Sequence, residues 1–276
     1  MVDSDKTPCT DSMRSHMDTA QDQQLSILGV KIFNVTKQRA IELLENVIRT
    51  RADRCRSVFF VNAHTLNLAA ADPEYRAILN LGDFVFGDGT GVRWAAKLQG
   101  ISVLDNLVGT DFTPLLLQST GGRGYSYFML GSDEQTVGRA ADYARQMFPD
   151  WRLSAYHHGY LTTPESTSAA VEQINTAKPD VLLVGMGNPL QEQWIHQNQT
   201  RLRVPICMGI GGLFDYWAGN VSRAPQWLRS LGHEWTWRLF QQPSDKARRY
   251  LIGNPLFLFR VVREKLTGRG SGGSQS

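Results

Sequence analysis

The sequence predicts an α/β fold, a Rossmann-like parallel sheet with helices on both of its faces. Two observations predict it. Short continuous apolar runs, such as residues 57–61 (SVFFV) and 180–184 (DVLLV), are typical of strands that are buried on both faces. Helical patterns of about 10–15 residues separate these runs, which indicates parallel β-α-β units.

Five apolar runs are expected to be strands: residues 57–61, 83–86, 125–130, 180–184 and 205–208. Helices are expected between them, from about residue 65 to 71, through residues 92–96, and from residue 132 to about 147. Ser132 is the expected cap of the third helix, because Asp133 and Glu134 follow it in the first turn. Pro149 closes that helix.

The domain organisation follows from composition. Residues 1–24 are polar and lack the apolar core of a secretory signal, so they are expected to be a disordered leader. The α/β domain is expected over residues 25–220, and a basic helical appendage over residues 221–268. Residues 269–276 are rich in Gly and Ser and are expected to be a disordered tail.

The net charge of +3 conceals an uneven distribution. Between Arg223 and Arg269 the chain has ten Lys/Arg and three acids, a net charge of +7, and the remainder carries −4. Trp and Phe residues are interleaved with these cations, which suits the headgroup layer of a membrane with anionic lipids. Nucleic acid is the competing partner, but the sequence has no RNA- or DNA-binding signature. An anionic membrane surface is therefore the expected partner.

The longest apolar stretch of this basic segment is residues 250–262, and Gly253, Asn254 and Pro255 interrupt it. A helix that spans a bilayer needs about 20 apolar residues. We therefore expect the segment to lie on a membrane and not to cross it.

The three cysteines are Cys9, Cys55 and Cys207. They are far apart in the sequence and form no CxxC motif or Cys/His cluster, which argues against a disulfide framework or a structural zinc and fits a reducing compartment. Cys207 lies in an apolar run and is expected to be a small core residue.

Polar residues that follow predicted strands are the candidates for a site, because ligands bind at the carboxyl ends of parallel strands. Asp88 stands between two glycines and is either a reactive carboxylate or a turn residue that satisfies local amides. His64 is either a substrate contact or the cap of the helix that follows. Gln191 and Glu192 open a helix, where they contact a ligand or act as caps. Asp215 is either a site residue or packed at the core edge.

Two glycine-rich turns, residues 185–187 and 209–212, also follow predicted strands and could cradle a phosphate group with backbone amides. Leu190 occupies the position of the third glycine in a GxGxxG fingerprint, and no P-loop lysine follows either turn. A Rossmann-type NAD-dependent oxidoreductase stays an alternative with an incomplete fingerprint, and neither a kinase nor an NTPase is indicated.

Eight segments in order make the chain resemble the bacterial WecG/TagA/CpsF glycosyltransferase family from about residue 27 to 265. They are Gly87-Asp88-Gly89-Thr90-Gly91-Val92, Gly109-Thr110-Asp111, Gly185-Met186-Gly187-Asn188-Pro189-Leu190-Gln191-Glu192, Gly211-Gly212-Leu213-Phe214-Asp215, Arg223-Ala224-Pro225, Glu234-Trp235-Thr236-Trp237-Arg238-Leu239, Pro243 and Arg248-Arg249-Tyr250. One such motif would be weak evidence, but eight in this order are specific.

The resemblance implies inverting, metal-free transfer of a sugar from a UDP-sugar to a polyprenyl-diphosphate-linked saccharide, in surface polysaccharide assembly. It makes Asp88 the general base that takes the proton of the acceptor hydroxyl. It places Asn62 and His64 in the substrate site, where threonine and asparagine are common among relatives. This departure leaves the donor sugar open between N-acetylmannosamine, its uronic acid and glucose.

The same segments supply the other expected site residues. The expected substrate contacts are Gly89, Thr90, Asp111, Gly187, Pro189, Gln191, Glu192, Gly211, Gly212 and Asp215. The expected phosphate or acceptor contacts are Arg223, Arg238, Arg248 and Arg249. No Asp-x-Asp pair follows a predicted strand, so arginines and helix N-termini are expected to offset the diphosphate charge in place of a metal.

No cofactor is expected besides the UDP-sugar, which is a substrate. The resemblance also implies a cytoplasmic protein bound to the inner face of the cell membrane and suggests a homo-oligomer. A non-catalytic peripheral membrane module is the other alternative that the basic segment allows.

Overall fold

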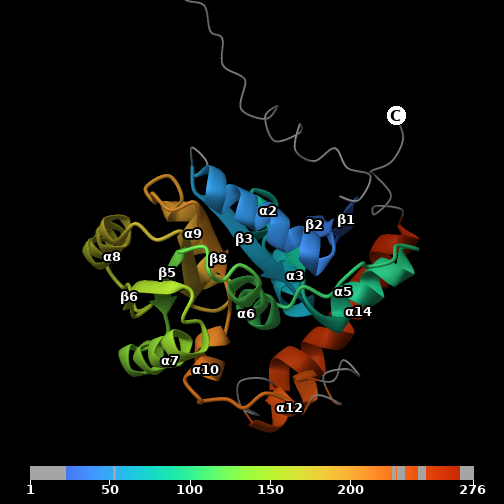
Figure 1. Cartoon of the computed structure of the whole chain (residues 1–276). Helices are drawn as coiled ribbons and strands as arrows, with labels where there is room; N and C mark the ends of the chain where they lie inside the picture. Colours follow the sequence, from blue (N-terminus) through green and yellow to red (C-terminus); the bar gives the residue numbers. More distant parts are fainter. Residues whose placement is uncertain (1–22, 52–53, 226–227, 229–233, 242–246, 268–276) are drawn as a thin grey trace, which may run out of the picture.

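The computed structural model describes residues 23–51, 54–225, 228, 234–241 and 247–267 (Figure 1). Its centre is an eight-stranded sheet in the order β1-β2-β4-β3-β8-β7-β5-β6, in which β1 pairs with β2 antiparallel and the other neighbours are parallel. The strands are β1 Gln23–Ile27, β2 Val30–Asn34, β3 Arg56–Val61, β4 Phe84–Gly87, β5 Ser126–Gly131, β6 Arg152–His157, β7 Val181–Gly185 and β8 Ile206–Gly209. The predicted α/β class is confirmed.

Helices cover both faces of this sheet (Figure 1). They are α2 Lys37–Thr50, α3 Ala63–Ala71, α4 Pro73–Asn80, α5 Gly89–Leu98, α6 Gly109–Ser119, α7 Glu134–Met147, α8 Pro164–Ala177, α9 Leu190–Asn198, α10 Leu213–Trp217, α12 Glu234–Gln241, the π-helix η1 Arg248–Ile252 and α14 Gly253–Leu266. All five predicted strands are present, with ends that differ by at most one residue.

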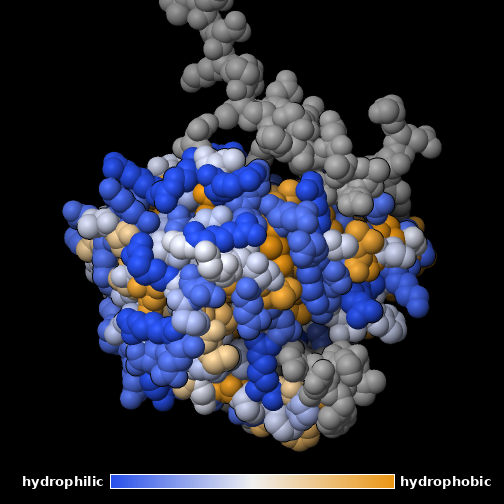
Figure 2. Space-filling model, viewed as in Figure 1, coloured by the Kyte–Doolittle hydropathy of each residue, from blue (hydrophilic) through white to orange (hydrophobic). Residues whose placement is uncertain are grey.

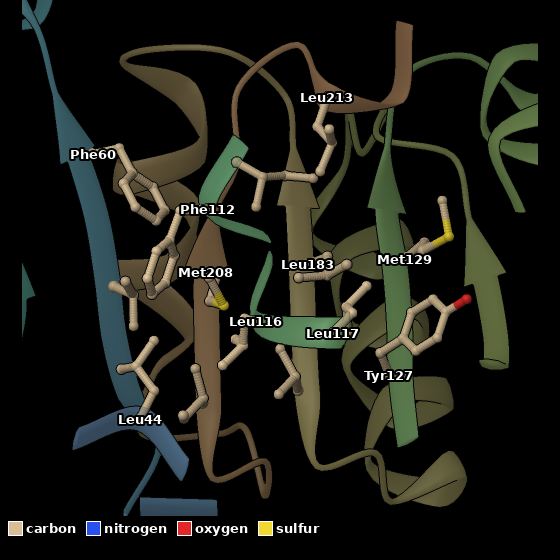
Figure 3. Packing of buried hydrophobic residues seen from close by; sticks show 14 of the residues in the cluster. Leu44, Phe60, Phe112, Leu116, Leu117, Tyr127, Met129, Leu183, Met208 and Leu213 are labelled. Atoms are coloured by element: carbon tan, nitrogen blue, oxygen red, sulfur yellow. The ribbon is translucent and has the colours of Figure 1, made fainter. Parts of the chain in front are cut away.

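Alternate strand residues feed two separate cores, because successive side chains of a strand point to opposite faces. On one face Phe60, Leu183 and Met208 pack with residues of α2, α6, α7 and α10 (Figure 3). On the other face the neighbouring residues of the same strands pack with α3, α4, α5, α8, α9 and α14. Cys207 belongs to this second core and is fully buried, as predicted, and it and Cys55 are both free thiols.

The chain begins its described part with a hairpin that the sequence analysis did not identify. Strand β1 starts at Gln23, two residues inside the segment expected to be a leader, while residues 1–22 lie outside the described residues. Leu28 and Gly29 form the turn with φ angles of 51° and 75°. Positive φ at both central residues matches the twist of paired strands, so this tight turn fits an antiparallel pair.

One helix cap differs from the prediction. Asp133, and not Ser132, is the N-cap of α7, and its Oδ1 accepts a hydrogen bond from the Thr136 backbone nitrogen at 2.9 Å. Ser132 has a φ of 54° and lies one residue outside the helix, at the end of β5. This position places Ser132 on the side of the sheet where a ligand would bind.

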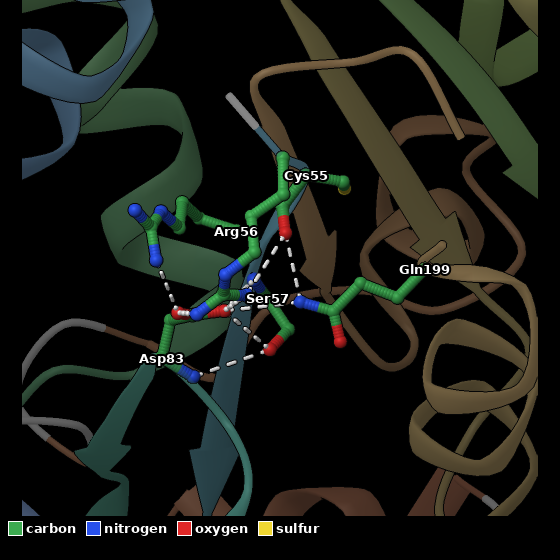
Figure 4. A network of polar contacts seen from close by, with 6 residues as sticks. Cys55, Arg56, Ser57, Asp83 and Gln199 are labelled. Atoms are coloured by element: carbon green, nitrogen blue, oxygen red, sulfur yellow. Dashed lines mark hydrogen bonds and ion pairs between the residues drawn. The ribbon is translucent and has the colours of Figure 1, made fainter. Parts of the chain in front are cut away.

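Asp83 ties together the opposite end of the sheet (Figure 4). Its Oδ2 accepts hydrogen bonds from the Ser57 backbone nitrogen at 2.9 Å and from Gln199 Nε2 at 3.0 Å. Arg54 and Arg56 form ion pairs with the same carboxylate, whose side chain is 2% exposed. The bonds fix the start of β4 against β3, so that their far ends, which carry the candidate site, are held in register.

The C-terminal helix α14 packs on α3 and α5. Phe257 and Val261 are each 1% exposed and belong to the second core. Gly253, Asn254 and Pro255, which interrupt the apolar stretch in the sequence, form the start of α14, and the chain passes from η1 into α14 without leaving a helical conformation. None of the helices in the described part of the chain is both long and apolar enough to span a membrane.

Candidate active site

The candidate site is an open cavity of about 980 Å³ at the carboxyl ends of strands β3, β4, β5, β7 and β8. Eleven of the expected site residues line it. They are Asn62, His64, Asp88, Gly89, Thr90, Gly187, Gln191, Gly211, Gly212, Asp215 and Arg249. The sequence argument from strand ends therefore predicts the location of this cavity.

Asp88 follows β4 directly and is the N-cap residue of α5, but its side chain makes no cap hydrogen bond to the helix. The Asn106 side chain serves that end of the helix, and its Oδ1 accepts from the Gly89 backbone nitrogen at 2.6 Å. The Asp88 backbone nitrogen donates to Val61 O at 2.8 Å, which fixes the turn to β3. The Asp88 carboxylate therefore does not cap the helix, as an aspartate in such a turn can, and it lines the cavity instead.

Asn62 and His64 begin the next helix over. Asn62 is the N-cap of α3, and its Oδ1 accepts from the backbone nitrogens of His64 at 3.0 Å and Thr65 at 3.2 Å. The alternative that His64 caps this helix is wrong, because it is the second residue inside it. Asn62 combines a capping role with a place on the cavity wall, and Arg249 Nη2 lies 3.4 Å from the same oxygen.

Two glycine turns, after β7 and after β8, also form part of the cavity wall. Gly187 and Gly211 have φ angles of 77° and 61°, a conformation that favours glycine, and a Cβ at either would meet no atom within 4 Å. Helix α9 begins behind the first turn and has no side-chain cap, like α5 behind Asp88. Backbone N–H groups at such helix starts carry partial positive charge and can hold an anion.

Glu192 and Pro189 do not line the cavity, contrary to the prediction for both. Glu192 is 0% exposed and accepts hydrogen bonds from Tyr75 Oη at 3.0 Å, Asn188 Nδ2 at 2.6 Å and Gln191 Nε2 at 2.7 Å. Burial raises the pKa of Glu192 to about 7, although these hydrogen bonds act in the opposite direction. Neither Gln191 nor Glu192 caps α9, so the expected capping alternative is wrong as well.

Burial and the nearby Glu192 carboxylate also raise the pKa of Tyr75, so its hydroxyl stays a donor at neutral pH. Gln191 does line the cavity, and its Oε1 accepts from the Gly211 backbone nitrogen at 2.9 Å. This one amide therefore connects the turn before α9 with the turn after β8.

Asp111 and Arg223, two further expected site residues, do not line the cavity. Arg223 forms an ion pair with Asp111, donates to Thr110 O, and lies with its guanidinium 4.9 Å from the centre of the Tyr216 ring. These contacts bind the segment after α10 to α6. The side chains of Arg238 and Arg248 lie outside the described residues. Arg249 is the one Lys or Arg that lines the cavity in the described part of the chain.

The cavity also contains residues that the sequence analysis did not select. Asn188 and Tyr250 lie inside quoted motifs, so a motif-based choice could have included them. Ser132 also lines it and follows the predicted strand over residues 125–130, whereas no local pattern marks Trp94, Asn106 and Tyr160. They reach the cavity because their loops or helices fold over the same end of the sheet.

The chemistry of this lining is that of a carboxylate beside anion-binding groups. Asp88 and Asp215 are the acids, and His64 and Arg249 carry the basic groups. Within the residues that the structure describes, no group of three His, Cys, Asp or Glu side chains could hold a metal ion. The arrangement can accept a proton at Asp88 and can offset negative charge at helix starts and at Arg249.

Comparison with known proteins agrees with this chemistry. The family model described as "Glycosyl transferase WecG/TagA/CpsF family" matches residues 25–271. An N-acetylglucosaminyldiphosphoundecaprenol N-acetyl-beta-D-mannosaminyltransferase of Staphylococcus aureus strain MRSA252 is 29% identical over 243 residues, 88% of this chain and 93% of the relative. The protein of the same name from strain MW2 is 28% identical over the same shares.

The family decides between the alternatives that the sequence left open, since it is a family of transferases and not of NAD-dependent oxidoreductases or non-catalytic membrane modules. The protein is therefore an enzyme that transfers a sugar, and the chain belongs to the WecG/TagA/CpsF family of glycosyl transferases.

Proposed function

We propose that this enzyme transfers a hexose or N-acetylhexosamine from a UDP-sugar to a polyprenyl-diphosphate-linked saccharide, with inversion, for surface polysaccharide assembly. The names of the Staphylococcus aureus relatives support a lipid-diphosphate acceptor and make N-acetylmannosamine the first donor sugar to test. Asn62 and His64 border the cavity where the expected contacts to the sugar lie, so they are the residues that set the choice of sugar.

The observation that carries the proposal is the position of Asp88. Its carboxylate lines the cavity at the end of β4 and is not used to cap the helix behind it. As the acceptor hydroxyl oxygen forms its bond to the anomeric carbon, Asp88 takes the hydroxyl proton. The bond from that carbon to the diphosphate oxygen breaks, and its electron pair leaves with UDP. Attack opposite the leaving group inverts the anomeric centre.

The leaving UDP needs positive charge, and the described part of the chain supports a source without a metal. Arg249 reaches the cavity, and α5 and α9 start at its wall with N-cap residues whose side chains do not bond to the helix. Preorganised donors of this kind typically contribute about 10²–10³-fold each to turnover when they face developing charge. Metal-independent transfer is thus part of the proposal.

The acceptor is a membrane lipid in this proposal, so the cavity must open toward a bilayer. Helix α14 lines the cavity with Asn254, Phe257 and Leu258, and other apolar side chains of η1 and α14 are exposed. Figure 2 shows apolar patches in the hydrophilic surface where α5 and α14 lie. Together with the basic charge of the segment, this supports binding to the inner face of the cell membrane.

The proposal is tested by the release of UDP from a panel of UDP-sugars with a short-chain diphosphate-linked N-acetylglucosamine acceptor. We expect Asp88→Asn to lower kcat by at least about 10²-fold, because the base is lost, while UDP binding and the far-UV spectrum stay as in the wild type. Asp105→Asn is the matched control, since Asp105 accepts from the Lys37 backbone nitrogen and does not line the cavity. Near-normal turnover by Asp88→Asn would remove the assignment.

A further inference from the structure

A buried carboxylate lies directly behind the cavity wall, at Glu192. It receives three hydrogen bonds, from Tyr75 on α4, from Asn188 before α9, and from Gln191 beside it. The structure gives it no ion pair within the described residues, and a buried carboxylate without a cation costs stability. A buried carboxylate of this kind needs a structural reason, and here the reason lies in the side chains that it holds in place.

Glu192 sets the orientation of two side-chain amides. Asn188 Nδ2 and Gln191 Nε2 both donate to Glu192 Oε1, which accepts hydrogen bonds whether Glu192 is ionised or carries its proton on Oε2 beside the Tyr75 hydroxyl. The Gln191 oxygen then faces the Gly211 backbone nitrogen, which can only donate, and the two ends of this amide are consistent with each other. For Asn188 the consequence is different. With one of its two N–H groups bound to Glu192, its carbonyl oxygen is directed away from that carboxylate and can accept a hydrogen bond from a ligand in the cavity that Asn188 lines.

On the basis of the proposed function, we propose that Glu192 is a positioning residue for the donor substrate. It fixes Gln191 as the link between the two glycine turns and fixes Asn188 as a hydrogen-bond acceptor on the cavity wall. The ligand group that donates a hydrogen bond to the Asn188 oxygen is then an O–H or N–H of the nucleotide sugar, such as a sugar hydroxyl, an acetamido N–H or the uracil N–H. Phosphate oxygens only accept hydrogen bonds, so the Asn188 oxygen does not bind the diphosphate, which faces the Arg249 guanidinium.

The competing explanation is that Glu192 only stabilises the fold, and the chain offers variants that separate the two. Glu192→Met keeps the length of the side chain but removes the acceptor from Asn188 and Gln191. Glu192→Gln keeps it, because both amides donate to the same oxygen, Oε1, and the new NH₂ group meets the Tyr75 hydroxyl, which accepts as well as donates. Tyr75→Phe is the matched control, since it removes one buried bond to Glu192 and leaves both amides held.

The experiment measures the affinity of UDP and of UDP-N-acetylmannosamine by calorimetry, and unfolding by urea, for wild type and the three variants. We expect Glu192→Met to weaken binding of at least the sugar nucleotide by about tenfold, because an acceptor is lost from the wall, and Glu192→Gln to stay within about threefold of wild type. Tyr75→Phe should lose stability but bind as the wild type does. Equal loss of affinity in Tyr75→Phe and Glu192→Met would overturn the positioning role, as would unchanged binding by a folded Glu192→Met.

Two further measurements keep the proposal open to refutation if Glu192→Met fails to fold or no nucleotide binds. Asn188→Ala changes a partly exposed residue and should reproduce the loss of affinity; wild-type affinity in this variant would overturn the proposal. In nuclear magnetic resonance spectra, the side-chain amide protons of Asn188 and Gln191 should exchange slowly in wild type and in Tyr75→Phe. Fast exchange in wild type would overturn the positioning role, whether or not the wild type binds a UDP-sugar. The absence of UDP-sugar binding would by itself refute only the proposed function.

Discussion

Arg249 places its Nη2 3.4 Å from Asn62 Oδ1, the oxygen that caps helix α3 at the end of β3. Residues 187 positions apart are thereby joined across the cavity, one from the basic C-terminal segment and one from the centre of the sheet. The segment that carries a net charge of +7 thus delivers a cation into the cavity. The C-terminal segment is part of the candidate site as well as of the surface.

This relationship predicts that Arg249→Ala weakens UDP binding and slows turnover. A guanidinium that offsets diphosphate charge is lost, and we expect a decrease in kcat/KM of about 10²-fold, with a smaller decrease for Arg249→Lys, which keeps the charge but not the planar donor pattern. Calorimetry with UDP and a UDP-release assay with a water-soluble acceptor give the two values.

Arg263→Ala is the matched control for Arg249. It removes the same charge from the same segment, but Arg263 is exposed on α14 and does not line the cavity. In solution this variant should bind UDP as the wild type does. If both variants bind UDP equally well, the cation that faces the diphosphate is not Arg249.

The raised pKa of Glu192 predicts how stability changes with pH. Burial moves this pKa from its ordinary value of 4.5 to about 7. Between these values the folded protein keeps a proton that the unfolded chain has released, so the free energy of unfolding falls as pH rises from about 4.5 to about 7 and then levels off. The full decrease corresponds to about 3 kcal/mol.

The matched comparison is with Glu192→Gln, which does not titrate. From pH 5 to pH 8 the wild type should lose about 2 to 3 kcal/mol of its free energy of unfolding relative to this variant, as measured by urea denaturation. A difference that stays constant over this range would mean that the three hydrogen bonds to Glu192 outweigh its burial and keep it ionised throughout.

The sheet could be predicted where its strands are continuous apolar runs. Residues 57–61 and 180–184 are such runs, and the structure places them in β3 and β7 at the centre of the sheet. The two edge strands β1 and β6 and the strand β2 beside β1 were missed, because they are partly exposed and their residues follow no simple pattern. The hairpin turn at Leu28-Gly29 also lacks the Asn-Gly or Asp-Gly pair that marks such turns in a sequence.

The location of the site could be predicted from strand ends. The role of a single residue could be predicted only where its neighbours in the sequence determine it, and not where distant residues do. Asp88 follows β4, and any side chain there faces the cavity. Glu192 was misplaced because its direction depends on Tyr75, a residue 117 positions away, whose hydroxyl lies in the second core. The ion pair of Arg223 could not be predicted for the same reason, since its partner Asp111 comes from helix α6.

Helix α14 presents a second apolar stripe on the side away from its core contacts. Leu256, Phe259, Val262 and Leu266 follow one another at intervals of three or four residues, and Phe259 and Leu266 are 63% and 82% exposed. Residues at this spacing share one face of a helix. Arg260, Arg263 and Lys265 lie between them in the sequence, so the helix can offer both apolar contact and positive charge to a bilayer.

We therefore expect the double substitution Phe259→Ser/Leu266→Ser to lower binding to vesicles with anionic lipids by at least about tenfold, because each large apolar side chain contributes about 1.5–3 kcal/mol when it leaves water. Binding should also weaken for neutral vesicles and at high salt, because the cations no longer meet negative charge. Leu81→Ser is the control, as Leu81 is 64% exposed but lies next to Gly82 and Asp83 at the opposite end of the sheet. Turnover with a water-soluble acceptor should stay unchanged in both variants, since none of these three side chains lines the cavity. If the double variant and Leu81→Ser bind equally well to anionic vesicles in a sedimentation assay, another surface of the protein contacts the membrane.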